Sequence, residues 1–516
     1  MIAVLRTSAA LFACLFSLAL PAPALAEGCR ACEASTLFYD GRADALAWTG
    51  PANAHLMDDL LRAVRGAASH GLNPAHYHLA VLEATDAAHP NREADALATD
   101  AYLTLADHLW SGRLDPVTIE PDWTALRRGG DLAIHLQAAL ASSAVFESLE
   151  ALAPPQADYQ ALRDALARYR EVAAAGGWPA TDLGPALHPD ERGPRVAQLR
   201  ARLAATGDIE AQSADPELFD AALADGVRSF QTRAGLDADG IVGARTLHQL
   251  NATPGERIAQ IRANLERWRW LPEEMGRRHI RVNIADFSLE ARADGVVERE
   301  HDVIVGQLYR KTPVFSGNMT YFILNPWWET PVSLAVRDKL PVFRENPDEV
   351  GRLGFQVIDR DGVLVDPATI DWPNVPAANF PYRLRQAPGP LNALGQVKFM
   401  FPNPHNVYLH DTPTRGLFAR SRRDFSSGCV RVQNWQDLAE WVAADTPDWT
   451  PERIDAAIAG GRETRVTLAG RVLVHILYWT ALPDAETGVR FVDDIYGRDP
   501  ALLAALDASP PPLESR

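Results

Sequence analysis

Residues 425–432 read Phe-Ser-Ser-Gly-Cys-Val-Arg-Val, and this stretch holds the cysteine whose neighbours indicate chemistry. Cys429 lies close to Arg431 and just before a helix expected to begin near Asn434, with Asn434 as its capping residue. Positive potential from the arginine and the helix start would stabilise a thiolate. Gly428 lets the backbone approach a reacting carbonyl, so amides near Cys429 could form an oxyanion hole. The stretch therefore predicts a cysteine nucleophile.

A strand-like run, Val407-Tyr408-Leu409-His410-Asp411, precedes the cysteine. His410 ends this run, 19 residues before Cys429, and its imidazole could take the thiol proton. Tyr408, two positions away, is expected on the same face, where it either lines the site or packs in the core. Asp411 should point to the other face, so a backbone carbonyl is an equal candidate for orienting the imidazole. The two runs together predict a Cys–His pair.

From His279 onward, apolar residues alternate with polar ones, as in strands with one buried face. Asp294-Gly295 is a hairpin turn signal within this pattern. We expect a mostly antiparallel β domain over residues 277–480. An insertion at about 325–395, rich in Trp and Pro and containing Trp328, is expected to be a lid loop over a site, or else a surface excursion pinned by buried tryptophans.

Two regions with helical spacing precede the β pattern. Residues 37–175 are rich in Ala and Leu and predict an α-helical scaffold. Residues 190–251 predict three short helices with a turn at Asp239-Gly240. The pattern R-x-F-Q-x-x-x-G-L-x-x-D-G-I-V-G-x-x-T-L, residues 228–247, resembles the small three-helix peptidoglycan-binding domain. That resemblance implies binding to the cell wall, whereas the apolar positions alone would equally build a small helical core.

The N-terminus and the net charge restrict where the protein works. Arg6, an apolar run from Ala9 to Leu20 and the small residues up to Ala26 predict a cleavable secretory signal over residues 1–26. No later segment is long and apolar enough to span a membrane, so we expect a mature chain outside the cytoplasm with no transmembrane anchor. The net charge of −17 argues against a nucleic-acid partner.

The chain has 4 cysteines, and three of them have an ordinary explanation. Cys14 would leave with the signal. Cys29 and Cys32 are expected to form a local disulfide in an oxidising compartment, in preference to a redox pair or a zinc site. Cys429 is left without a partner, and an unpaired thiol in an exported protein needs a reason.

His410, the loop after it and the Ser-Ser-Gly-Cys-Val-Arg-Val stretch resemble L,D-transpeptidases, especially the large periplasmic members with a helical scaffold and a peptidoglycan-binding domain. The resemblance implies an α+β multidomain protein with residues 481–516 as a C-terminal tail. It makes Cys429 the nucleophile and His410 the base. Many family members have a histidine where this chain has Ser427, which leaves His410 as the one base. The other implied residues are Gly428, Ser427 and Arg431 as oxyanion or orienting groups, and Tyr408, Phe425, Ser426, Trp328 and Asn434 as substrate-binding groups.

The reaction implied by the resemblance is acyl transfer without a cofactor. Cys429 attacks the carbonyl between the third residue of a stem peptide, a diamino acid, and its terminal D-alanine. The amine of a second stem then resolves the thioester and cross-links two third residues. Water as acceptor would make the enzyme an L,D-carboxypeptidase, and a lipoprotein lysine would attach that protein to the wall. Carbapenems should acylate Cys429; other wall-synthesis enzymes are candidate partners, and a wall-binding protein with an idle catalytic domain is the remaining alternative.

Charged residues around the pair have more than one interpretation. Arg431 would bind a stem carboxylate, tune the thiol or pair with Asp424. Four arginines before Cys429 either attract carboxylate-bearing stems or serve solvation alone: Arg415, Arg420, Arg422 and Arg423. A metal site made by His405, His410 and Cys429 would need a carboxylate helper, so no metal is expected.

Overall fold

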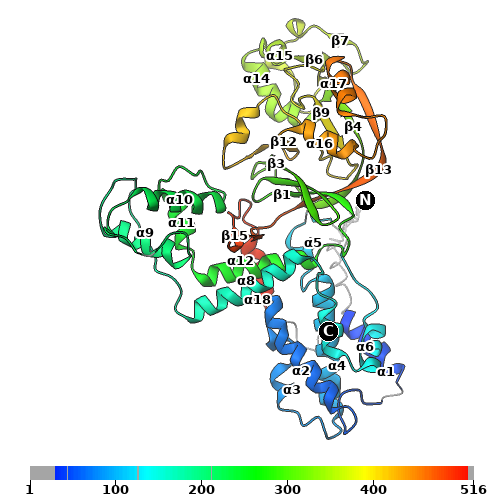
Figure 1. Ribbon diagram of the computed structural model, residues 1–516. Coiled ribbons are helices and arrows are strands. Elements are labelled where there is room, and N and C mark those ends of the chain that lie inside the picture. The colour runs from blue at the N-terminus through cyan, green and yellow to red at the C-terminus, as the bar shows by residue number, and fades with distance from the viewer. Residues whose placement is uncertain (1–29, 43–44, 122, 125–126, 211, 510–516) are drawn as a thin grey trace, which may run out of the picture.

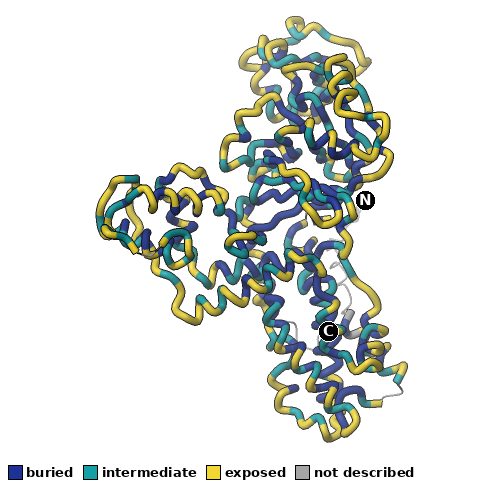
Figure 2. The backbone as a smooth tube through the Cα atoms, in the orientation of Figure 1, coloured by how far each residue is buried: buried dark blue, intermediate teal, exposed yellow. Residues whose placement is uncertain are grey.

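The computed structural model describes residues 30–42, 45–121, 123–124, 127–210 and 212–509. The expected signal, Cys29 and the side chain of Cys32 lie outside what it describes, and so does the expected disulfide. Three arms meet at a central pair of helices, α8 (Ala157–Ala174) and α12 (Pro254–Arg269) (Figure 1). Figure 2 shows buried segments running through this meeting point.

The lower arm of Figure 1 is all-helical, as the Ala- and Leu-rich sequence predicts. Its core contains Trp48 and Tyr102, both fully buried. The buried carboxylate of Asp95 accepts hydrogen bonds from the backbone N–H groups of Trp48 (2.7 Å) and Thr49 (3.0 Å), which ties the first loop to the longest helix. The elements are α1 (Arg30–Asp40), α2 (Ala54–Gly66), η1 (Ala67–His70), η2 (Pro74–Tyr77), α3 (Leu79–Glu83), α4 (Arg92–Ser111), α5 (Pro116–Ile119), α6 (Leu132–Ser142) and α7 (Val145–Glu150).

The left arm of Figure 1 is a three-helix module with its own small core. Its helices are α9 (Pro194–Ala205), α10 (Ala221–Arg233) and α11 (Ala244–Asn251). Gln231 holds the turn between the last two helices: its side chain donates to Asp239 Oδ1 (2.8 Å) and accepts from Gly240 N (2.9 Å). Gly240 has a φ of 77°, which favours glycine. The polar part of the sequence pattern therefore builds the turn, and its apolar part builds the core.

Helix α12 joins the three arms. Thr253 and Glu256 form a capping box at its start, which satisfies backbone donors that a helix leaves free. Arg267 near its end is fully buried between Glu120 of the lower arm (3.2 Å) and Asp499 of the C-terminal segment (2.5 Å). The helix thus carries a buried ion network where other helices carry apolar residues.

The upper arm is a nine-stranded sheet in the order β11-β3-β12-β10-β9-β4-β13-β1-β2. Strand β2 also pairs with β3, which closes the sheet into a barrel. Six strand pairings are antiparallel, while β1–β13, β10–β12 and β11–β3 are parallel. The elements are β1 (Arg278–Asn283), β2 (Ser288–Ala293), β3 (Val296–Gly306), β4 (Phe315–Leu324), β9 (Val397–Met400), β10 (Leu409–His410), η6 (Arg415–Ala419), β11 (Asp424–Ser426), β12 (Val430–Val432), α16 (Trp435–Ala443), α17 (Pro451–Ala459) and β13 (Thr464–Leu477).

The segment expected as a lid loop, about 325–395, is instead a folded subdomain. It has a second sheet, in the order β5-β8-β6-β7, and a core that buries Trp328, Phe343 and Trp372. In the sequence, the tryptophans of this segment suggested a lid loop. In the structure they form the core of the subdomain, since burying large aromatic rings is strongly favourable. The elements are β5 (Trp328–Glu329), α13 (Val332–Leu334), the π-helical η3 (Ala335–Lys339), α14 (Leu340–Glu345), α15 (Glu349–Arg352), β6 (Phe355–Ile358), β7 (Leu364–Val365), η4 (Pro367–Thr369), η5 (Trp372–Asn374) and β8 (Arg383–Gln386).

Residues 481–509 are part of the core and do not form a tail. Strands β14 (Ala481–Asp484) and β15 (Gly488–Phe491) form a hairpin against α8, and α18 (Asp499–Asp507) packs against α12. Apolar residues drive this packing, because Val489 and Leu502 are buried in the main core. The expectation of a tail was wrong because short segments of this kind become stable only against distant parts of the chain.

Candidate active site

Strand register places the two predicted catalytic residues on one face of the barrel. His410 lies opposite Arg431 of β12 and opposite Lys398 of β9. Side chains directly opposite one another share a face, and so do residues two apart in a strand. Cys429 is two residues from Arg431, and Tyr408 is two residues from His410. All five side chains are therefore on the same face, with Cys429 and His410 as diagonal neighbours.

This face points away from the barrel core and towards the inserted subdomain. Leu409 and Val430, which alternate with the site residues, are fully buried in the barrel core. Tyr408 packs against the core of the subdomain instead, and the Trp328 indole hydrogen-bonds to its hydroxyl. Both interpretations of Tyr408 from sequence therefore hold together: it packs, and it lines the site. Trp328 is thus linked to Cys429 through this tyrosine.

The Cys429 thiol is partly exposed and sits among uncharged hydrogen-bond partners. Its Sγ lies 3.9 Å from the carbonyl oxygen of Asn406, and both the backbone N–H and the hydroxyl of Tyr408 interact with it. Burial raises the pKa of the thiol above its usual value, although the hydrogen bonds from Tyr408 and the charges of Lys398 and Arg431 oppose this rise. Loss of solvent therefore opposes the thiolate that the sequence predicts, while the positive charges favour it.

Asn434 does not belong to the site. The helix that follows Cys429, α16, begins only at Trp435, after the whole of strand β12. Asn434 occupies the N-cap position with a φ of 50°, but its side chain makes no capping hydrogen bond. Strand β12 and the turn at Gln433-Asn434 separate Cys429 from the start of α16.

His410 is buried and held in one tautomer. Its Nδ1 lies 2.5 Å from the backbone oxygen of Asp411, which can only accept, so Nδ1 carries the proton and Nε2 is the free base. Burial lowers the pKa of His410 to about 3, with further lowering by Arg431 and Lys398. The Asp411 carboxylate turns away and accepts from Gln396 N (2.9 Å). The orienting group is thus the backbone carbonyl.

A hydroxyl network fixes the loop before the cysteine. Ser426 Oγ accepts from Gly428 N (3.1 Å) and donates to the carbonyl of Cys429. Thr312 Oγ1 donates to the carbonyl of Gly428 (2.9 Å). Gly428 has a φ of 114°, which only glycine adopts readily. Because its N–H is already engaged, Gly428 serves the conformation of the loop and does not offer the free oxyanion donor expected from sequence.

Ser427 connects this loop to the inserted subdomain. Its Oγ accepts from Arg310 Nη1 (3.0 Å), and the same guanidinium forms a two-point ion pair with Asp338 of η3 (2.5 Å). Phe425 belongs to the edge strand β11, and the guanidinium of Arg420 lies over its ring (5.6 Å). Two strands, β3 and β12, separate β11 from the strand that carries His410. Arg310 and Asp338 carry no sequence signal, because their contact joins a loop to the distant helix η3.

Most of the nearby arginines have structural partners. Arg422 pairs with Asp424 (2.8 Å), so Asp424 is not the partner of Arg431. Arg423 pairs with Asp302 (2.8 Å). Arg431 bonds only Thr414 (3.3 Å) among the described residues, and its Nε is buried without a partner. Arg431 and Arg420, which lies over the Phe425 ring, are thus the arginines of the set without a carboxylate partner among the described residues.

Lys398 is the site residue that sequence reasoning did not assign. Its ammonium lies over the Tyr408 ring (4.1 Å), and burial lowers its pKa. Its position follows from strand pairing, which alternation within one strand does not reveal. His405 turns the other way, to Thr124 of the lower arm (3.3 Å). The described residues contain no group of three or more His, Cys, Asp or Glu placed to hold a metal ion.

Comparison with known families identifies three domains in the chain. Residues 277–454 match the "L,D-transpeptidase catalytic domain", residues 192–250 the "Putative peptidoglycan binding domain" and residues 33–166 the "Scaffold domain". The chain therefore contains a catalytic domain of the L,D-transpeptidase family together with a peptidoglycan-binding domain and a scaffold domain. In the part that the structure describes, no helix combines the length and apolar character needed to cross a membrane.

Individual relatives agree with this assignment. A Haemophilus influenzae protein named "Putative L,D-transpeptidase" is 37% identical over 236 residues, which are 46% of this chain and 47% of that protein. The chain thus spans about half the length of this curated relative. The N-acetylmuramoyl-L-alanine amidase CwlM of Mycobacterium tuberculosis is 34% identical over 113 residues, 17% of this chain and 28% of that protein.

Solved structures of two L,D-transpeptidases are also similar in part. The one from Stackebrandtia nassauensis is 14% identical, with 58% of this chain and 96% of that chain covered and a TM-score of 0.22. The one from Xylanimonas cellulosilytica is 16% identical, with 57% and 99% covered and a TM-score of 0.19. TM-scores this low do not establish a common arrangement of the whole chain.

Proposed function

We propose that the protein is an L,D-transpeptidase that cross-links the third residues of peptidoglycan stem peptides through a thioester on Cys429. The observation that carries this proposal is the diagonal pairing of Cys429 with the free Nε2 of His410 on one face of the barrel. The catalytic-domain match supports the reaction class, and the peptidoglycan-binding domain supports the substrate.

The first half-reaction releases D-alanine. As the sulfur of Cys429 bonds to the carbonyl carbon of the third residue, His410 Nε2 takes the thiol proton. Because burial raises the pKa of the thiol, proton transfer to His410 assists the attack. Lys398 and Arg431, which lack carboxylate partners among the described residues, stabilise the developing negative charge. The C–N bond then breaks, and the imidazolium returns the proton to the leaving amine.

The second half-reaction restores the thiol. The side-chain amine of another stem attacks the thioester carbon while His410 Nε2 takes its proton. The S–C bond breaks, and the proton passes to the sulfur. The inserted subdomain is placed to act as a lid, because Trp328 and Asp338 connect it to both sides of the cysteine. Water excluded by such a lid would favour the amine as acceptor.

Two stem tetrapeptides incubated with the full chain test the proposal. Mass spectrometry should detect a cross-linked dimer and released D-alanine, and Cys429→Ala should form neither. Carbapenem treatment should add one acyl group at Cys429. A shortened monomer without dimer would make the protein an L,D-carboxypeptidase, and the absence of product and adduct would leave a wall-binding protein with an idle catalytic domain.

We propose that the protein is located in the periplasm. The N-terminal signal pattern and the wall-related domains support export. Cell fractionation with N-terminal sequencing should recover the protein in the periplasmic fraction, beginning near Glu27. An uncleaved cytoplasmic protein would contradict export and leave the chemistry untouched.

A further inference from the structure

A cavity of about 470 Å³ lies where the three-helix module meets the centre of the molecule. Its walls come from α8, α9, α10, α12 and the β14–β15 hairpin; Figure 1 shows α9 and α10 in the left arm and α8, α12 and β15 at the centre. Five arginines line it: Arg168, Arg202, Arg233, Arg257 and Arg490. Glu486 is the one acidic residue in the lining, although Arg233 pairs with Asp208 and Arg490 with Asp286 just outside it, so the excess positive charge of this arginine cavity rests on Arg168, Arg202 and Arg257.

Two of these guanidinium groups are buried without a counter-charge. Arg202 is 3% exposed and donates to the Leu250 carbonyl (2.6 Å), while its guanidinium covers the Trp178 ring (4.4 Å). Arg257 is 8% exposed and donates to the carbonyl of Gln249 (2.8 Å). Neither forms an ion pair with a described residue. Burial lowers the pKa of each to about 10, which expresses the cost of holding a charge away from water.

Tyr169 marks where the positive charges converge. Burial raises the pKa of its phenol, and the charges of Arg257, Arg168, Arg202 and Arg233 all act against that rise. Its ring is flanked edge-on by Trp178 (5.8 Å) and Phe491 (5.4 Å). The cavity therefore combines aromatic walls with several donors, a lining typical of sites for small ligands, and its volume is in their usual range.

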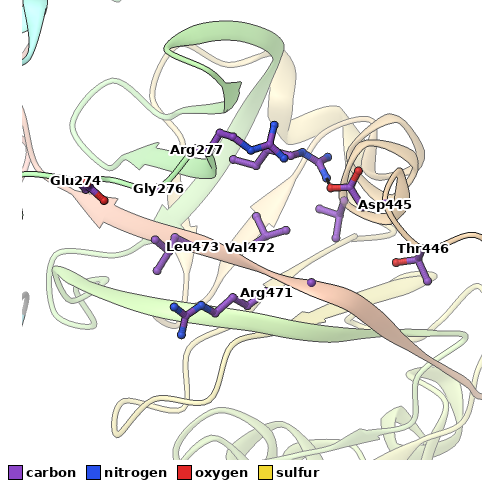
Figure 3. Close-up of a pocket in the computed structure, with 11 residues that line it drawn as sticks. Glu274, Gly276, Arg277, Asp445, Thr446, Arg471, Val472 and Leu473 are labelled. Carbon is purple, nitrogen blue, oxygen red and sulfur yellow. Dashed lines mark hydrogen bonds and ion pairs between the residues drawn. The ribbon is translucent and has the colours of Figure 1, made fainter.

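Two arginines of a second cavity, in contrast, are paired with carboxylates. That cavity, in Figure 3, lies at the far end of the barrel, between the start of β1, α16 and β13. There Arg278 is paired with Asp445 and donates to the Trp441 carbonyl. Arg277 pairs with Asp294 (3.4 Å). The third arginine of that lining, Arg471, is exposed and has no ion pair among the described residues, so burial without a counter-charge is the distinctive property of the arginine cavity.

We propose that the arginine cavity binds a short peptide with more than one free carboxylate. Guanidinium groups match carboxylates with two parallel hydrogen bonds, and a ligand would supply the missing negative charge of Arg202 and Arg257. The acidic surface disfavours long polyanions, while a short ligand fits the volume. The identity of that peptide as a wall stem rests on the proposed function. The stem would be held away from Cys429, at the joint between the wall-binding module and the catalytic arm.

Calorimetry on the full chain carrying Cys429→Ala tests this site without turnover. The probe is a synthetic stem tetrapeptide with free carboxylates, compared with the same peptide fully amidated and with inorganic phosphate. We expect the free peptide to bind at least tenfold more tightly than either comparison. Equal binding of the amidated peptide or of phosphate would overturn the proposal.

Two mild variants and a matched control locate the binding. Arg168 is exposed and donates to the Thr487 carbonyl (2.8 Å), so Arg168→Gln should fold and weaken binding about fivefold. Tyr169→Phe keeps the ring packing and should cost roughly threefold. Arg471→Gln makes the same charge change in the cavity of Figure 3 and should leave affinity unchanged. Affinity insensitive to both cavity variants would refute the site, while cross-linking activity, assayed separately with Cys429 intact, reports on the proposed function.

Discussion

Arg267, at the junction of α12 with the lower arm, and Arg431, beside Cys429, are both withdrawn from solvent, but their partners differ. Arg267 lies between Glu120 and Asp499, and a second arginine, Arg498, shares Glu120 (2.6 Å). Arg431 has one hydroxyl partner and a buried Nε without any. The charges at the junction are paired with one another, whereas Arg431 on the catalytic face has no carboxylate partner among the described residues.

The difference separates charges that hold the arms together from charges kept for chemistry. Removing one member of a buried, balanced network leaves its partners uncompensated, which is costly. Donors without a counter-ion are already oriented for a charge that appears only during reaction, so no reorganisation is needed at that moment. Lys398 and Arg431 are donors of this kind. The arginines of the arginine cavity that have no ion pair among the described residues are also of this kind.

The largest expected effect is at the junction. Glu120→Gln removes the charge that Arg267 and Arg498 share and should lower the free energy of unfolding by about 3–5 kcal/mol. Urea denaturation followed by circular dichroism measures the loss. Arg192→Gln, which breaks an exposed pair with Asp215, is the control and should cost less than about 1 kcal/mol. Equal losses in the two variants would show that the junction charges are not a special network.

The next effect concerns pH and His410. Its pKa is about 3 in the folded protein, against about 6.5 in an unfolded chain, so between these values only the unfolded state is protonated. Stability from this residue is therefore lost as pH falls below 6.5, by about 2 kcal/mol between pH 7 and pH 5. Denaturation at both pH values should show a correspondingly smaller loss in His410→Asn. An identical loss in the variant would mean that the imidazole is protonated in the folded state.

A smaller effect is expected from Lys398. Lys398→Met removes a half-buried cation that has no carboxylate partner among the described residues, so stability should hold while the Cys429 thiol pKa rises further. The rate of iodoacetamide modification as a function of pH measures that shift. Cross-linking should slow by about tenfold at neutral pH. An unchanged thiol pKa would show that Lys398 does not act on the sulfur.

The smallest effect is expected from Asn434. Asn434→Gly keeps the positive φ at the start of α16, and the side chain makes no capping bond. Cross-linking should stay within about twofold of the parent, and stability within about 0.5 kcal/mol. A tenfold loss of activity would return this residue to the substrate site, contrary to its place at the far end of β12.

The sequence predicted well where a signal is local. The Asp294-Gly295 turn joins β2 to β3, and alternation from His279 onward matches the barrel strands. Gln231 and Gly240 form the turn of the module. His410 and Cys429 lie on one face because His410 ends β10, Cys429 directly precedes β12, and these two strands are neighbours in the sheet.

What the sequence missed depends on contacts between distant segments. Lys398 became a site residue only through its pairing opposite His410, and the burial that raises the thiol pKa comes from the packed subdomain around Tyr408. The parallel pairing of β10 with β12 and the charged, buried face of α12 also lack a local pattern. From the sequence alone, Arg267 would be expected on the surface, because its partners Glu120 and Asp499 are far from it in the chain.

The ion network at the end of α12 also sets an order of assembly. Glu120 comes early in the chain, Arg267 in the middle and Asp499 late, so the junction cannot be complete until synthesis has passed α18. The lower arm, the three-helix module and the inserted subdomain each have a core of their own that can form earlier. Newly made protein should therefore exist for a time as folded but loosely jointed arms. The last helix, α18, then joins the arms when Asp499 pairs with Arg267.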